Sequence, residues 1–133
     1  MKTSIIALAT LIFSTTALAE TEHYLRRDGN HVQHLKISHV EDEIFVTADV
    51  DFDANENEAG KKHCSGAITG EAKKTGENEI TFRKHIEGEA RHCTLKIQLS
   101  PEGARVEQSP ECGYYVAGIC HFDSDGKELT RIK

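Results

Sequence analysis

The strict alternation of apolar and polar residues in short runs is the feature that most constrains how this chain can fold. Segment 44–52 reads IFVTADVDF, and segment 92–99 reads HCTLKIQL. The side chains of a strand point alternately to its two faces, so each run would have one buried face and one exposed face. The first run would bury Ile44, Val46, Ala48, Val50 and Phe52, and the second would bury Cys93, Leu95, Ile97 and Leu99. Both segments are therefore predicted to be strands.

Turn signals separate the apolar runs at intervals of about ten residues, which is typical of antiparallel sheets. They lie at 28–30, 41–43, 73–78, 87–90, 100–103 and 123–126. No run has the 3.6-residue period of an amphipathic helix. The pattern therefore predicts an all-β domain: a single antiparallel β-sandwich or barrel of about seven to eight short strands. Segment 31–40 is the least regular, because both of its faces mix apolar and polar residues.

The first 19 residues have the three regions of a secretory signal peptide. Lys2 is followed by an apolar run at 5–13, and Ala17-Leu18-Ala19 has the small-x-small pattern of a cleavage site. The apolar run is too short to anchor the protein in a bilayer. We expect a signal peptide at 1–19 and a single exported β domain at 20–133. This domain would be periplasmic or secreted, without membrane insertion.

The chain has four cysteines, at 64, 93, 112 and 120. An even number of cysteines in an exported protein predicts two disulfides, and four cysteines allow three pairings. We favour Cys112 with Cys120, because the short segment between them can fold back on itself. Cys64 would then pair with Cys93, joining two strand positions that face the core.

Three of the cysteines have a histidine as a neighbour: His63-Cys64, His92-Cys93 and Cys120-His121. Segments 63–68 and 92–99 are predicted strands, and adjacent residues of a strand point to opposite faces, so a His-Cys pair there cannot bind one ion without a bulge. The spacings of common zinc sites are also missing. We therefore predict no metal site and no cofactor, with His63 and His92 facing solvent or a partner.

The sequence does not predict an enzyme. A G-x-S-x-G nucleophile elbow is absent, and segment 51–62 departs from a calcium loop at Glu56 and Lys62. Asp49 and Asp51 share the polar face of segment 44–52. They either discourage edge pairing of the strand or form an acidic stripe for a cation or a basic partner.

Tyr114 and Tyr115 lie between two cysteines and are bracketed by glycines, which indicates a constrained loop. Tyrosine rings suit protein interfaces, because they bury a large area and lose little entropy. The two rings either fill the core under the bend or contact a partner, and each ring can take one of these roles. We add His121, which follows the last cysteine, to this predicted surface.

Removal of residues 1–19 takes away one base, Lys2, and no acid, so the net charge of −6 becomes −7. An acidic protein has no electrostatic attraction for nucleic acid, whereas it attracts basic proteins. We therefore expect a basic protein partner and no nucleic acid. The sequence makes no prediction about the oligomeric state.

An acidic, exported, disulfide-linked all-β domain of this size resembles the small periplasmic lysozyme inhibitors of Gram-negative bacteria. Ser65-Gly66-Ala67, directly after Cys64, is similar to the start of the loop that C-type inhibitors insert into the lysozyme cleft. Thr69 stands where that family has a tyrosine. Immunity proteins against toxins that attack the cell wall have the same general profile.

The resemblance implies an inhibitor or immunity protein against a peptidoglycan hydrolase. The residues expected to contact a basic hydrolase or toxin are Ser65, Tyr114, Tyr115, His121, Asp49 and Asp51. One alternative is a periplasmic module that binds a small ligand or a metal without catalytic activity, which the eight histidines would suit. Another is a structural interaction protein of the cell envelope with no discrete site.

Overall fold

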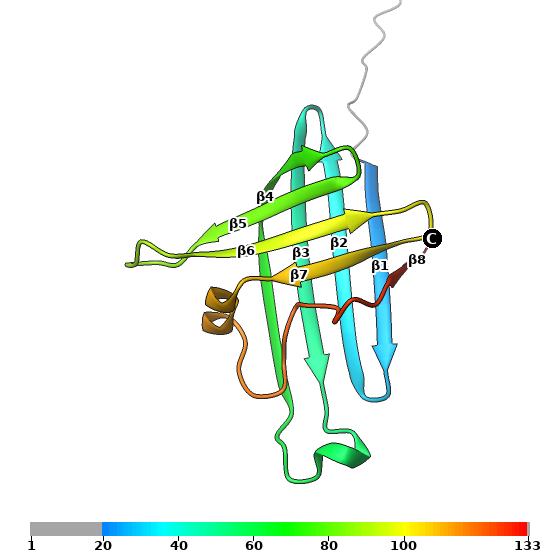
Figure 1. Ribbon diagram of the computed structural model, residues 1–133, viewed down its shortest axis with the longest axis vertical. Helices are drawn as coiled ribbons and strands as arrows, with labels where there is room; N and C mark the ends of the chain where they lie inside the picture. The colour runs from blue at the N-terminus through cyan, green and yellow to red at the C-terminus, as the bar shows by residue number, and fades with distance from the viewer. Residues whose placement is uncertain (1–19, 133) are drawn as a thin grey trace, which may run out of the picture.

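Eight antiparallel strands follow one another in chain order around a closed barrel in the computed structural model, which describes residues 20–132 (Figure 1). The strands are β1 (Glu20–Asp28), β2 (His31–Val40), β3 (Glu43–Phe52), β4 (Cys64–Gly76), β5 (Glu79–His85), β6 (His92–Leu99), β7 (Gly103–Gln108) and β8 (Leu129–Ile132). Two short 3-10 helices, η1 (Glu56–Glu58) and η2 (Pro110–Tyr114), interrupt this order. The predicted signal peptide lies outside the described residues.

The prediction of an all-β fold is confirmed, and the barrel is closed by the short strand β8. On one side β8 pairs with β1, where Ile132 is opposite His23, and on the other with β7, where Thr130 is opposite Gly103. Closure removes free sheet edges, to which other chains could add. Figure 1 shows β5, β6 and β7 crossing in front of β1, β2 and β3 at a steep angle.

The core fills the inside of the barrel, as expected for a barrel of only eight strands. The two predicted alternating strands are β3 and β6, and their inward residues are buried, except Ile44 and Leu99 at the strand ends, which are half-buried. The core cluster draws on every strand of the barrel, and its members in β2, β3, β5 and β6 include Leu35, Ile37, Val46, Val50, Phe52, Ile80, Phe82, Leu95 and Ile97. This packing leaves the outer face of the barrel as the surface for contacts with other molecules.

A buried glutamine explains the irregular pattern of segment 31–40. This segment forms β2, and Gln33 points inward with only 2% of its surface exposed. Its side-chain amide donates hydrogen bonds to the carbonyl oxygens of His121 at 3.2 Å and Asp123 at 2.7 Å. The polar residue on the inner face of β2 therefore holds the segment that crosses this part of the barrel.

Strand β8 pairs only with the start of β7, and the second half of β7 is covered by the irregular segment 109–128, which connects the two strands. The Ser124 amide donates to the Val106 carbonyl, and the Ser124 hydroxyl accepts from the Val106 amide, both at 2.9 Å. The side-chain oxygen of Gln108 accepts from the amides of Phe122 at 2.6 Å and Asp123 at 3.2 Å. Side chains thus supply hydrogen bonds that a strand ladder would otherwise provide.

Segment 109–128 ends in the predicted Asp-Gly turn. Asp125 and Gly126 both have positive φ, 55° and 73°, and the Lys127 amide donates to the Ser124 carbonyl. Two successive positive φ values favour Asp-Gly, because glycine has no Cβ to strain the backbone there. The turn leads into β8, but the residues before it do not form a strand, so it does not connect the two strands of a hairpin.

The two predicted disulfides are present, but the favoured pairing is wrong. Cys64 is bonded to Cys120 and Cys93 to Cys112, so all four cysteines are oxidised. Residues 112–120 do not fold back on themselves, because Cys112 belongs to η2, which packs on β6, whereas Cys120 lies where the chain reaches the start of β4.

The barrel also explains why Cys64 and Cys93 do not meet. Strand β5 lies between β4 and β6. Cys93 of β6 is opposite Lys84 of β5, and the Lys84 ammonium donates to the Thr69 carbonyl of β4. Cys93 is therefore level with Thr69, five residues along β4 from Cys64. Two disulfides are typical of an oxidising, extracytoplasmic compartment. Among residues 20–132, no helix has the length and apolar character needed to cross a membrane.

Candidate protein-binding surface

The helix η2 is fixed to β6 by a disulfide and by main-chain hydrogen bonds. Pro110 occupies the first turn, where its missing N–H costs no hydrogen bond. The Ser109 amide donates to the Thr94 carbonyl, and the Thr94 amide donates to the Ser109 hydroxyl oxygen, both at 2.9 Å. Cys112, which is fully buried, adds the bond to Cys93. Residues at the end of η2 therefore project from a fixed base.

The two tyrosines at the end of η2 take different roles. Tyr115 packs against the core, and its hydroxyl donates to the His85 carbonyl oxygen at 3.2 Å. Tyr114 is 62% exposed, the highest value among the exposed large apolar side chains of the described residues. The rings meet edge to face, with centroids 5.1 Å apart. Tyr115 thus supports Tyr114, which faces solvent. We name Tyr114, Tyr115, His85 and His92 the tyrosine surface.

His85 and His92 lie opposite each other at the end of the β5–β6 hairpin, with ring centroids 4.9 Å apart. Burial, with smaller contributions from Tyr114 and from the negative charge of Glu87, raises the pKa of Tyr115, so its hydroxyl stays protonated as a donor. The backbone amide of Glu111 and the Ser109 hydroxyl hold the pKa of the Glu111 carboxyl below its usual value. The tyrosine surface therefore combines aromatic rings with nearby ionised carboxylates.

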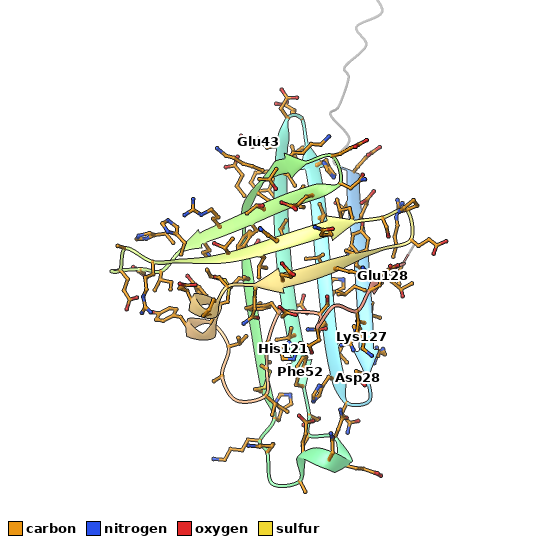
Figure 2. All side chains as sticks on the ribbon, in the orientation of Figure 1. Asp28, Glu43, Phe52, His121, Lys127 and Glu128 are labelled. Atoms are coloured by element: carbon orange, nitrogen blue, oxygen red, sulfur yellow. A yellow bond between two sulfur atoms is a disulfide. The ribbon has the colours of Figure 1, made fainter. Side chains whose placement is uncertain are left out.

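His121 does not join the tyrosine surface. Its ring packs edge-on against Phe52 of β3, with centroids 5.1 Å apart, and its Nδ1 lies 2.6 Å from the Asp123 carbonyl oxygen. Figure 2 shows His121 and Phe52 together, below the strands that cross the front of the barrel. Although the sequence grouped His121 with the tyrosines, the structure gives it contacts to a different part of the barrel.

The Ser65-Gly66-Ala67 triplet lies inside strand β4, and does not begin a free loop. Ser65 and Ala67 are exposed on the outer face, whereas the segment that follows the tyrosines covers Gly66. A Cβ at Gly66 would lie 2.7 Å from a methyl carbon of Val116 and 3.0 Å from the Tyr115 carbonyl oxygen. Glycine is therefore required here by packing.

Asp49 and Asp51 face outward from β3, and each has a histidine partner. Asp49 Oδ2 is 3.1 Å from His34 Nδ1, and Asp51 Oδ1 is 2.5 Å from His63 Nε2. Ser65 lies directly opposite Asp51 in the register of β3 and β4. The stripe is thus a row of Asp–His pairs in place of bare carboxylates. No sequence pattern indicates these pairs, because the histidines come from another strand or from the loop before β4.

Within residues 20–132, no three side chains of the metal-binding types converge on one point. The tyrosine surface offers aromatic faces and hydroxyls, which are groups for binding a protein surface. From the sequence, His85 was missed and His92 was expected only to face solvent or a partner, because only the pairing of β5 with β6 and the Tyr115–His85 hydrogen bond bring them to this surface. No protein-family model matches the chain, and neither does any curated protein sequence or solved structure.

Proposed function

We propose that the protein is an exported inhibitor or immunity protein that binds a basic peptidoglycan hydrolase through the tyrosine surface. The observation that carries this proposal is the exposed Tyr114, held on a 3-10 helix that is bonded covalently to the barrel. A large exposed aromatic ring on a fixed support is typical of a residue that dominates a protein interface.

A fixed support matters because association must offset the entropy lost when flexible side chains and loops become ordered. The disulfide, the hydrogen bonds of Ser109 and the Tyr115–His85 contact order this region before any partner arrives. Tyr114 can therefore contribute most of its burial to affinity. This property is what a tight inhibitor requires.

The charge of the chain supports a basic partner. The net charge is −6 for the full chain and −7 without residues 1–19. Opposite charges accelerate encounter, and the effect weakens as salt screens them. Glu87 carries negative charge next to Tyr115, and Glu111 lies on η2 near the positive charge of Arg91. The protein would act by occupying the partner without chemistry of its own, in the oxidising compartment where cell-wall hydrolases work.

The filled barrel argues against the small-ligand alternative. An eight-stranded barrel either packs its interior with side chains or keeps a cavity for a ligand. Here fully buried side chains such as Phe82, Leu95 and Ile97 fill the interior. The outer surface is therefore the better candidate for function.

The test is a panel of purified lysozymes and wall-degrading toxins, assayed on peptidoglycan with and without the disulfide-bonded protein. We expect at least one basic enzyme to be inhibited at a 1:1 ratio, with association that slows as salt increases. If a molar excess at low salt inhibits none of them, the proposal is wrong.

A further inference from the structure

Two histidines from neighbouring strands meet on the outer face of the barrel, apart from the tyrosine surface. His34 of β2 lies opposite Leu25 of β1, which makes His23 its diagonal neighbour on the same face. His23 Nδ1 is 3.1 Å from His34 Nε2, and the ring planes differ by only 19°. Both side chains are partly buried. Their facing nitrogens are thus held close together by the register of the strands.

Asp49 determines the tautomer of His34, and so determines that the nitrogen facing His23 has a free lone pair. Asp49 lies directly opposite His34 on β3, and its Oδ2 is 3.1 Å from His34 Nδ1. An ionised carboxylate only accepts hydrogen bonds, so Nδ1 of His34 carries the hydrogen. Nε2 of His34 is then an acceptor directed at His23. Histidines that bind metals usually donate their other N–H to a carboxylate in this way.

The separation of the two nitrogens suits a shared metal ion. Two nitrogen ligands at about 2.0–2.1 Å from a tetrahedral ion lie roughly 3.3 Å apart. The observed separation of 3.1 Å is close to this value, and both rings must tilt so that their lone pairs, which lie along the hydrogen bond, converge on the ion. We propose that His23 and His34 bind one Cu²⁺ or Zn²⁺ ion, that Asp49 orients His34, and that water completes the coordination.

Binding requires His23 to present a lone pair at Nδ1. In the hydrogen-bonded pair Nδ1 of His23 carries the hydrogen, so the proton moves to Nε2 of the same ring when the ion binds. The neutral rings exchange a hydrogen bond for a metal ion, and no proton is released. Lys36 lies opposite His23, but its side chain is exposed to water. Because imidazole binds Cu²⁺ more strongly than Zn²⁺, Cu²⁺ should bind to this site more tightly than Zn²⁺.

This site combines residues of three neighbouring strands, β1, β2 and β3, and does not depend on the proposed inhibitor function. It also differs from the His-Cys neighbours that the sequence analysis considered, because its ligands come from two strands. A matched control exists in the His85–His92 pair. Those rings also face each other across two strands, but they meet edge to face at an angle of 70°.

The experiment is calorimetric titration of the disulfide-bonded protein with Cu²⁺ alone and with Zn²⁺ alone. We expect one equivalent to bind, His34→Ala or His23→Ala to weaken binding by about tenfold or more, and Asp49→Asn to weaken it by about tenfold. His85→Ala should leave binding unchanged. In parallel, nuclear magnetic resonance of the histidine rings of the unmodified protein should show His23 and His34 responding first to Zn²⁺.

The site would be refuted if neither ion shows saturable binding to the unmodified protein. It would be equally refuted if His34→Ala retained full affinity, or if the rings of other histidines responded first. The ring measurement needs no variant, so a misfolded substitution cannot obscure the answer.

Discussion

The run of strands from β1 to β6 and the segment 109–128 are held in place in different ways. The strands share ladders of main-chain hydrogen bonds, and β2 pairs with β3 over the full length of both. Segment 109–128 has no ladder. It is fixed by side chain to main chain bonds from Gln33, Gln108 and Ser124, and by two disulfides that each have one end in it.

Segment 109–128 shows that a part of this protein can be ordered without a ladder of main-chain hydrogen bonds between strands. Many interchangeable contacts hold the strands, so no single outer residue should be essential there. A few specific contacts hold segment 109–128, so single substitutions in or beneath it should have large effects. The two tyrosines of the proposed binding surface belong to this second kind of region, whereas its two histidines lie on β5 and β6.

The largest effect should follow removal of a disulfide. On the chain-entropy model, replacing Cys64 and Cys120 by alanine should cost about 4 kcal/mol, and replacing Cys93 and Cys112 about 3 kcal/mol. The order follows from the sequence separations of 56 and 19 residues. Urea unfolding monitored by circular dichroism gives both values. Amide exchange should accelerate first in segment 109–128, and equal acceleration in β1 to β6 would contradict the contrast.

The next largest effect should come from Gln33→Ala. Two carbonyl oxygens of segment 109–128 would lose their donor, and a buried side chain would leave a void. We expect a loss of about 2–3 kcal/mol in the free energy of unfolding. Gln98→Ala is the matched control, because Gln98 is exposed on β6. A loss of similar size in both variants would show that segment 109–128 does not depend on Gln33.

A smaller effect should separate two glycines. Gly66→Ala places a Cβ 2.7 Å from Val116, so the covering segment must shift, at about 1–3 kcal/mol. Gly113→Ala meets nothing within 4 Å and should change stability by less than about 0.5 kcal/mol. Thermal melts of both variants provide the comparison. Equal melting temperatures would mean that the segment does not press on β4.

The smallest effect concerns Tyr24, a buried side chain of β1 near the place where β8 closes the barrel. Tyr24 is 2% exposed, and burial, with a hydrogen bond of 2.7 Å to Glu22, raises its pKa well above the usual range. The neutral ring is favoured in the folded state, so its contribution is complete below pH of about 10 and is lost as pH rises further. The stability advantage of the unmodified protein over Tyr24→Phe should therefore shrink between pH 9 and 11 (about one unit either side of the ordinary tyrosine pKa). A constant difference would contradict this.

The two regions also differ in how far the sequence predicts them. Alternation in 44–52 and 92–99 predicted β3 and β6, because one face of each strand is buried and the other is in water. The pairing of the cysteines could not be predicted, because it depends on η2 packing on β6. The alternation of apolar and polar residues in β2 was weak because Gln33 points inward. Its hydrogen-bond partners are carbonyl oxygens distant in sequence, so the sequence could not indicate that this glutamine is buried.

For the candidate surface, the sequence predicted Tyr114 and Tyr115 as a pair but placed His121 wrongly beside them. The tyrosines are adjacent in sequence, so their proximity was certain, whereas the position of His121 depends on where Cys120 is bonded. The Asp–His pairs along β3 could not be predicted from the sequence either, because they depend on how the strands pair. Only the registers of the barrel bring His34 to Asp49.

We propose that Tyr114, fixed by the Cys93–Cys112 disulfide, dominates binding to a cell-wall hydrolase. The most direct measurement is the inhibition constant of Tyr114→Ala beside that of Phe45→Ala, a control that removes an aromatic ring 38% exposed on β3. Tyr114→Ala should weaken inhibition by about tenfold or more, equivalent to about 1.4 kcal/mol, while Phe45→Ala should have little effect. Unchanged inhibition by Tyr114→Ala, or an equal loss in both variants, would contradict the account.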